Sequence, residues 1–205
     1  KADEICKGQK HLLSNIINDT KNEKKIVWFH VSSLGEFEQG KSIISAYKKK
    51  YTSHKILLTV YSPSAYSIIK TNPISNWVFY LPHDTSKNAK LFISKVKPIK
   101  AIFIKYEFWY NYISELHKNN IPLYYISSVF RKEQYFFTFY GRWFAKQLRK
   151  VTHFFVQNEE SKTLLNNIGI HQIMISGDSR FDSVRMNERE KYSNKIITNF
   201  INNSK

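Results

Sequence analysis

The stretch "KIVWFHVSSLGEFEQG", residues 25 to 40, decides the fold of this chain. Its apolar run (25–31) ends in a Ser-Ser-Leu-Gly turn, and a helical pattern begins near residue 37. A short run that is apolar on both faces is typical of a buried strand in a parallel sheet. The junction also places an acid, Glu36, at the end of this strand in a chain that is basic elsewhere. We therefore predict a strand-to-helix unit with a carboxylate at its mouth.

The same alternation of strand and helix continues along the chain. It predicts an α/β fold with a doubly wound, mainly parallel, Rossmann-like sheet, because right-handed crossovers cover both faces of such a sheet with helices. The expected strands are 25–31, 55–61, 77–81, 99–105, 122–127, 152–157 and 172–176. The expected helices are 37–50, 63–72, 84–96, 108–119, 131–149 and 158–167.

The 205 residues are expected to form three parts. These are a helical lead (1–24), one Rossmann-like domain (25–185), and a C-terminal helix (186–205) that leads out of the domain. An apolar content of 42% excludes a disordered chain and suffices for a sizeable core. No apolar run approaches the ~20 residues that a membrane-spanning helix needs.

The charge balance limits the classes of partner. A formal charge of +16 favours an anionic partner, which is nucleic acid, a phosphorylated substrate or a membrane surface. Lysines are scattered rather than grouped, so compositional drift explains the charge equally well. The single cysteine, Cys6, excludes an internal disulfide and fits a reducing compartment. The seven histidines show no metal-ligand spacing, so we expect no metal site.

Three polar side chains follow strand ends: Glu36, Glu107 and Arg180. Ligands of open α/β sheets bind beyond the carboxyl ends of the strands, where the strand order reverses. In a 3-2-1-4-5 order the first and fourth strands are neighbours at that point, so Glu36 and Glu107 face one crevice. Glu36 is either a favourable charge in the first turn of a helix or a general base.

The surroundings of the other two side chains leave alternatives open. Glu107 lies in "IKYEFWYN" (104–111), where aromatic neighbours desolvate the carboxylate and raise its pKa unless it is exposed at a helix start. Arg180, in "ISGDSRFDSV" (175–184), suits a bidentate contact with phosphate or carboxylate, or a salt bridge within its loop. Gly35 permits a tight turn, and together with Gly40 leaves room for a phosphate at the helix start.

The segment "EQYFFTFYGRWFAKQLRK" (133–150) carries surplus aromatic residues. As one helix it is apolar over roughly 220°, whereas a helix that covers a sheet needs about 100°. An acyl chain or an anionic membrane surface fits this face, and a helix buried on two sides is the alternative. The cations that border it are Arg131, Lys132, Arg142, Lys146, Arg149 and Lys150.

Six stretches occur in the order of a known family. They are "WFHVSSLGEFEQG", "LTVYSPSAY", "FYLPHD", "IKYEFWYN", "VQNEES" and "ISGDSRFDSV". Over about residues 5–185 the chain resembles the N-terminal half of the 3-deoxy-D-manno-octulosonic acid (Kdo) transferases of lipopolysaccharide assembly. The resemblance implies the acceptor-binding half of a GT-B glycosyltransferase, whose second domain, outside this sequence, binds the donor CMP-Kdo.

The resemblance also implies a reaction and residue roles. Kdo passes to a lipid A precursor (lipid IVA) at the cytoplasmic face of the bacterial inner membrane, with inversion and without a metal or cofactor. Glu36 matches the general base, while Glu107 and Arg180 match transition-state stabilisers. Many relatives carry Lys where this chain has Arg180. We further expect Ser33, Gly35 and Arg142 to contact the acceptor.

Partners follow from the same resemblance. We expect a lipid A precursor, CMP-Kdo and an anionic membrane surface, and no nucleic acid. Because the membrane anchor usual in the family is missing from this sequence, attachment is expected through the basic and aromatic segment. The isolated half is expected to bind acceptor lipid without turnover. The alternatives are a non-catalytic module for anionic lipid or nucleic acid, and a GT-B enzyme that uses another nucleotide sugar.

Overall fold

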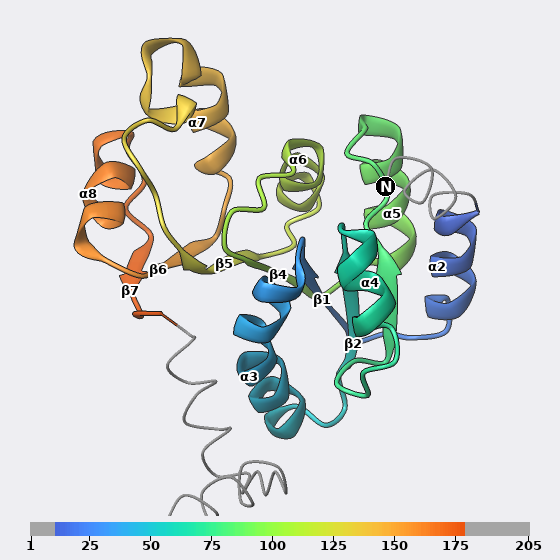
Figure 1. The fold of residues 1–205 in the computed structure, drawn as a ribbon. Coiled ribbons are helices and arrows are strands. Elements are labelled where there is room, and N and C mark those ends of the chain that lie inside the picture. Colours follow the sequence, from blue (N-terminus) through green and yellow to red (C-terminus); the bar gives the residue numbers. More distant parts are fainter. Residues whose placement is uncertain (1–10, 179–205) are drawn as a thin grey trace, which may run out of the picture.

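Seven parallel strands form one sheet in a computed structural model that describes residues 11–178 (Figure 1). Their order is β3-β2-β1-β4-β5-β6-β7, so the predicted order is confirmed and the reversal lies between β1 and β4. All seven expected strands are present, which confirms the doubly wound Rossmann-like class. The strands are β1 (Ile26–Val31), β2 (Lys55–Val60), β3 (Trp77–Tyr80), β4 (Lys100–Ile104), β5 (Leu123–Ser128), β6 (His153–Val156) and β7 (Ile173–Ile175).

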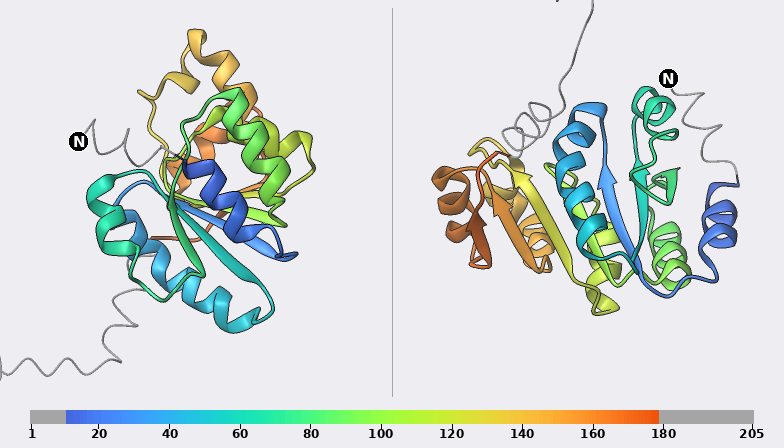
Figure 2. Two further views of the ribbon diagram at one scale, coloured as in Figure 1. Left: turned by 90° about the vertical axis from the view of Figure 1, so that its right-hand side faces the viewer. Right: turned by 90° about the horizontal axis from the view of Figure 1, so that it is seen from below.

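Helices cover both faces of the sheet, with α3 and α4 on one face and α5 and α6 on the other (Figure 2). The helix α2 packs against α5. The helices are α2 (Leu12–Thr20), α3 (Leu34–Lys50), α4 (Pro63–Ile69), α5 (Ser86–Val96), α6 (Tyr110–Lys118), α7 (Arg142–Leu148) and α8 (Glu159–Asn167).

Strand β1 explains why the fold follows from its sequence. Every residue of "IVWFHV" is buried. Successive side chains point to opposite faces of a strand, so Trp28 enters the core beneath α5 and α6 while Phe29 enters the core beneath α3 and α4. Fully burying one such side chain stabilises the fold by roughly 2–3 kcal/mol. A strand that is apolar on both sides is stable only between two layers of helices.

Gly40 has a packing role that differs from the expected one. A Cβ at this position would lie 3.1 Å from Cγ1 of Ile104 in β4. The small residue therefore lets α3 approach the sheet closely, and the prediction that Gly40 leaves room for a phosphate is wrong.

The prediction of one helix over 131–149 is also wrong. Two short 3-10 helices, η1 (Tyr135–Phe137) and η2 (Phe139–Gly141), precede α7. The chain folds back on itself, so that a Cβ on Gly141 would lie 1.6 Å from the carbonyl oxygen of Tyr135. Side chains in this segment therefore do not follow a 100° period, and the predicted apolar arc of a single helix does not exist.

Other expectations concern the ends of the chain. Arg180 and the predicted helix 186–205 lie outside the described residues, and the bounds of the three predicted parts remain predictions. Within residues 11–178, none of the helices combines the length and the apolar character needed to cross a membrane.

Candidate active site

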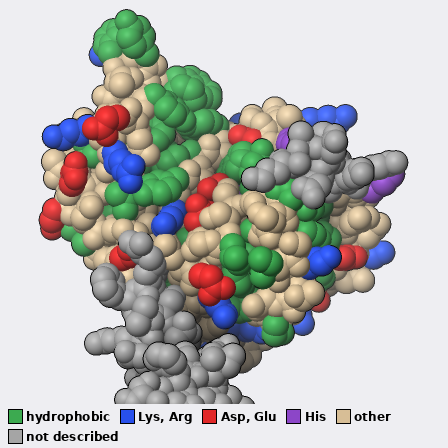
Figure 3. Space-filling model, viewed as in Figure 1, with side chains coloured by type: hydrophobic (Ala, Val, Ile, Leu, Met, Phe, Trp, Pro, Cys, Tyr) green, Lys and Arg blue, Asp and Glu red, His purple; other side chains and the backbone are tan. Residues whose placement is uncertain are grey.

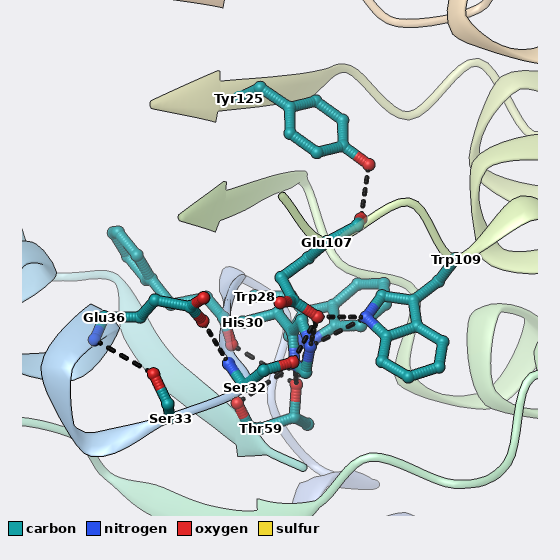
Figure 4. Close-up of polar contacts among 10 residues, drawn as sticks. Trp28, His30, Ser32, Ser33, Glu36, Thr59, Glu107, Trp109 and Tyr125 are labelled. Carbon is teal, nitrogen blue, oxygen red and sulfur yellow. Dashed lines mark hydrogen bonds and ion pairs between the residues drawn. The ribbon is translucent and has the colours of Figure 1, made fainter. Parts of the chain in front are cut away.

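The carboxyl ends of β1 and β4 form the candidate site. The two strands pair in parallel, from Val27 with Lys100 to His30 with Phe103. After β1 the chain turns through Ser32 and Ser33 into α3, and after β4 it passes through residues 105–109 into α6. The first turn of α3 and this second connection therefore meet at the reversal of the strand order, as predicted (Figure 4).

Ser32 lies between the two predicted carboxylates. Its backbone N–H donates to Glu36 Oε2 at 2.6 Å, and its hydroxyl donates to Glu107 Oε2 (Figure 4). Residues that are far apart in the sequence thus share one hydrogen-bonding neighbour. The prediction that Glu36 and Glu107 come together at the reversal of the strand order is confirmed, whereas a crevice in front of them remains a prediction.

Glu107 is held at both its side chain and its backbone. The carboxylate is only 8% exposed. Trp109 Nε1–H donates to Glu107 Oε2 at 2.9 Å, and Nε2 of His30 lies 3.3 Å from the same oxygen. The hydroxyl of Tyr125 donates to the backbone carbonyl of Glu107 at 2.6 Å. The backbone and the carboxylate therefore have a fixed position.

The pKa of Glu107 is lowered, which contradicts the expected rise. Burial does raise the pKa, as the aromatic neighbours suggested. The hydrogen bond and charge interaction with His30, followed by the hydrogen bonds from Ser32 and Trp109, outweigh burial because they favour the anion. Aromatic neighbours can be read from the sequence, whereas the convergence of these groups on one oxygen depends on the fold. Glu107 is consequently a carboxylate at neutral pH.

The pKa of Glu36 is shifted in the opposite direction to that of Glu107. Burial, and then the negative charge of Glu107, raise its pKa to about 7. The backbone N–H groups of Ser32 and Ser33, and the charge of Lys105, act in the other direction but are weaker. Two carboxyl groups whose pKa values are pushed apart can divide acid–base roles. Near neutral pH Glu36 takes up and releases a proton, whereas Glu107 stays charged.

Two further predicted residues lie beside Glu36. Ser33 is the N-cap of α3, and its Oγ accepts from the N–H of Glu36 at 3.3 Å. Gly35 lies within the first turn of α3 and not in a turn before it. The prediction that Gly35 permits a tight strand-to-helix turn is therefore wrong. A Cβ on Gly35 would have no atom within 4 Å among the residues beyond its chain neighbours, so this position borders open space.

The remaining predicted residues lie elsewhere. Arg142 is on α7, where its guanidinium lies 4.4 Å from the centre of the Phe139 ring, and it contacts this ring rather than the carboxylate pair. Glu38 is exposed on α3, as expected of a surface residue. Within the described part of the chain, no group of three or more His, Cys, Asp or Glu side chains is placed to hold a metal ion.

Sequence reasoning missed His30, Ser32 and Trp109. His30 is completely buried, and its Nδ1 lies 2.8 Å from Oγ1 and 3.1 Å from the carbonyl oxygen of Thr59. A titratable ring inside the apolar run "IVWFHV" was an available signal, because a buried polar group needs partners. Trp109 gave no such signal, since an aromatic residue in an aromatic stretch suggests core packing.

The fold defines the class: an α/β domain with a doubly wound parallel sheet, Rossmann-like and of the GT-B type. Among solved structures with this fold is the UDP-GlcNAc 2-epimerase from Neisseria meningitidis bound to UDP-GlcNAc. It is 11% identical, with 86% of this chain and 52% of that chain covered and a TM-score of 0.59. The UDP-N-acetylglucosamine 2-epimerase from Rickettsia bellii is 16% identical, with coverages of 86% and 51% and the same TM-score of 0.59. At such low identity the likeness shows the fold alone.

The particular family follows from the sequence of this domain. The family model described as 3-deoxy-D-manno-octulosonic-acid transferase (kdotransferase) matches residues 9–183, and the chain belongs to this family. A 3-deoxy-D-manno-octulosonic acid transferase from Aquifex aeolicus is 36% identical over 90 residues, which are 43% of this chain and 25% of that protein. The one from Rickettsia felis is 22% identical over 180 residues, or 87% and 39%. The chain thus spans 39% or less of the length of these relatives.

Proposed function

We propose that this chain is the acceptor-binding half of a glycosyltransferase that moves Kdo from CMP-Kdo to a lipid A precursor, lipid IVA, in lipopolysaccharide biosynthesis. Family membership supports the reaction class. The observation that carries the mechanism is the carboxylate pair, in which Ser32 binds both carboxyl groups and the pKa of Glu36 is raised to about 7. A general base works best when its pKa lies near the working pH.

In the proposed reaction Glu36 is the general base. A hydroxyl of the acceptor sugar attacks the anomeric carbon of Kdo, and Glu36 takes the hydroxyl proton while the new C–O bond forms. The bond from that carbon to the CMP phosphate breaks, and CMP leaves with the electron pair. Such proton removal contributes about 10²–10⁴-fold to the rate. Attack from the face opposite the leaving group inverts the centre, and no metal takes part in the proposed step.

Glu107 has a different proposed role, because it stays ionised. Its carboxylate is fixed before the reaction and faces the crevice, so that it stabilises positive charge that develops on the Kdo ring. Arg180 is proposed to balance the negative charge that develops on the departing phosphate.

The lipid part of the acceptor is proposed to meet the aromatic protrusion, which we define as residues 131–150. Its tip carries apolar side chains that stand away from the sheet (Figure 3). Tyr140 is 92% exposed, Phe139 70% and Trp143 56%. Exposed aromatic residues bordered by cations suit an anionic membrane surface at the cytoplasmic face of the bacterial inner membrane.

A cavity at the base of the protrusion supports this proposal. It has a volume of about 440 Å³ and lies between the protrusion and α8. Phe136 and Phe139 line it together with Arg142 and Arg149. Aromatic walls with guanidinium groups suit an amphiphile that carries a phosphate, which supports the proposal that Arg142 contacts the acceptor.

Transfer by the full-length protein tests the proposed function. Glu36→Gln is expected to reduce kcat for transfer from CMP-Kdo to lipid IVA by at least about 100-fold while lipid binding is kept. The matched control, Glu38→Gln, changes an exposed residue on the same helix and is expected to keep activity. Unchanged transfer in Glu36→Gln would contradict the proposal.

Two alternatives are tested in parallel. Transfer from UDP-sugars but not from CMP-Kdo would indicate another GT-B enzyme. Tight binding of duplex DNA at physiological salt, without transfer, would favour a nucleic-acid-binding module, because non-specific binding weakens steeply with salt.

A further inference from the structure

The segment that carries Glu107 presents alternate side chains to two different neighbours. Glu107 and Trp109 face β1, where both contact His30. Phe108 and Tyr110 face the aromatic protrusion. The Phe108 ring lies 5.0 Å from that of Phe136, the Tyr110 ring lies 4.8 Å from that of Phe144, and the Tyr110 hydroxyl is hydrogen-bonded to that of Tyr135. The segment is therefore held by contacts with β1 on one side and with the aromatic protrusion on the other.

On the β1 side, three polar groups converge on a single oxygen, Oε2 of Glu107. They are the Ser32 hydroxyl, the Trp109 indole N–H and Nε2 of His30 (Figure 4). The Trp109 Nε1 lies 2.9 Å from both Glu107 Oε2 and His30 Nε2. When Nε2 carries the proton that it donates to Glu107, it cannot accept, so the indole N–H donates to Oε2. Hydrogen bonds of this kind are strong when the acceptor is charged.

His30 is itself held by buried partners. Its Nδ1 contacts both oxygens of Thr59, and Oγ1 of Thr59 accepts from the Trp28 indole at 2.7 Å. His30 and Thr59 are both fully buried in the neighbouring central strands β1 and β2. His30 is therefore shielded from any ligand in the crevice, and it can influence the chemistry only through Glu107.

We propose that His30 and Trp109 are positioning residues, which hold the Glu107 carboxylate against Ser32 so that a fixed negative charge faces Glu36. The catalytic importance of this arrangement rests on the proposed function. The positions of His30, Trp109 and Glu107 are independent of it. The charge on Glu107 helps to keep Glu36 basic enough to accept a hydroxyl proton, while Lys105 and the N–H groups of Ser32 and Ser33 oppose it.

Carbon-13 NMR of the glutamate carboxyl groups in this chain tests the inference without any substrate. Glu36→Gln and Glu107→Gln assign the two resonances, and pH titration gives their midpoints. Trp109→Phe keeps a ring against His30 and Tyr61 but removes the N–H. This variant is expected to raise the Glu107 midpoint by about one pH unit or more, because a donor to the anion is lost.

Two further variants sharpen the test. His30→Gln is expected to produce a larger rise, since it removes a charge interaction as well as a hydrogen bond. Trp77→Phe is the matched control, because Trp77 is the first residue of the edge strand β3 and is not a hydrogen-bonding partner of Glu107, so both midpoints are expected to stay in place. An unfolding curve for each variant confirms that it is folded.

The outcomes separate the inference from the proposed function. A folded Trp109→Phe variant whose Glu107 midpoint equals that of the parent would overturn the inference. If that variant does not fold, an unchanged midpoint in folded His30→Gln overturns it instead. The titration needs no Kdo transfer, so the positioning can be confirmed even where the transfer assay fails.

Discussion

Glu36 and Glu107 share one residue as a hydrogen-bond donor. The N–H of Ser32 donates to the first carboxyl and its hydroxyl donates to the second. The arrangement is asymmetric, because Glu107 is also held by His30 and Trp109, whereas burial and the charge of Glu107 raise the pKa of Glu36. The two acids therefore have different proton affinities and, in the proposed reaction, different roles.

The rate of transfer by the full-length protein is expected to depend on the ionisation of Glu36. Its raised pKa predicts that kcat/KM increases with pH, with a midpoint at about 7. Glu107→Gln removes a negative charge that raises this pKa, so the midpoint is expected to move to lower pH. The pH profiles of the two proteins provide the measurement. An unmoved midpoint would contradict the coupling.

The stability of the chain is expected to show the same ionisation. Because the pKa of Glu36 is about 7 in the folded state against an ordinary value of 4.5, the folded state binds the proton more tightly. Stability therefore decreases as pH increases from about 4.5 to about 7. Glu36→Gln removes this cost and is expected to raise the free energy of unfolding by about 2 kcal/mol at high pH, after discounting for partial exposure.

Denaturant unfolding at low and high pH measures this effect. At low pH, where Glu36 is protonated in both states, the substitution is expected to change little. Glu38→Gln on the same helix is the control and is expected to change stability by less than about 0.5 kcal/mol at either pH. If Glu36→Gln stabilises the chain equally at both pH values, the effect does not come from the raised pKa of Glu36, and this prediction is contradicted.

Two glycines are expected to respond oppositely to alanine. Gly141→Ala places a Cβ 1.6 Å from the carbonyl oxygen of Tyr135, so the backbone must move and the cost is expected to exceed about 2 kcal/mol. Gly35→Ala meets no atom within 4 Å and lies in a helix, where it is expected to stabilise the chain by about 0.5–1 kcal/mol. Thermal unfolding ranks the two variants.

The same Gly35→Ala variant is expected to reduce transfer by the full-length protein, because it adds a methyl group at a position that is proposed to contact the acceptor. Normal transfer with a normal KM for the acceptor would exclude Gly35 from that site.

Binding to vesicles is expected to depend on the tip of the aromatic protrusion. Replacing Phe139, Tyr140 and Trp143 by Ser together removes roughly 3 kcal/mol of apolar contact, or about a hundredfold in partitioning onto anionic vesicles. Ile68→Ser is the control, because Ile68 on α4 is as exposed as Trp143, at 56%. Vesicle co-sedimentation at low and high salt provides the measurement. If Ile68→Ser loses as much vesicle binding as the triple variant, the tip of the aromatic protrusion is not a specific lipid-binding surface.

The sequence predicted the sheet well because its strands are apolar on both faces, a pattern that only a covered parallel sheet satisfies. The closeness of Glu36 and Glu107 followed from the strand order, because β1 and β4 are neighbours at its reversal. The protrusion was mispredicted because a periodicity argument assumes a continuous helix, whereas the close approach of Gly141 to Tyr135 interrupts it. The pKa of Glu107 was mispredicted because its donors come from three separate positions, His30, Ser32 and Trp109, which only the fold assembles.

The aromatic contacts of Tyr110 have a geometric consequence for the proposed acceptor. Tyr110 packs on Trp143 and Phe144, with ring centres 5.7 Å and 4.8 Å away, and it lies three residues after Glu107. In the proposed membrane arrangement, a bilayer that meets Trp143 is separated from the carboxylate segment by these edge-to-face and tilted aromatic rings. If the proposed function holds, this layer of rings sets the height at which the acceptor sugar stands above the lipid to reach Glu36, and we expect a headgroup of matching length to be favoured over a sugar in free solution.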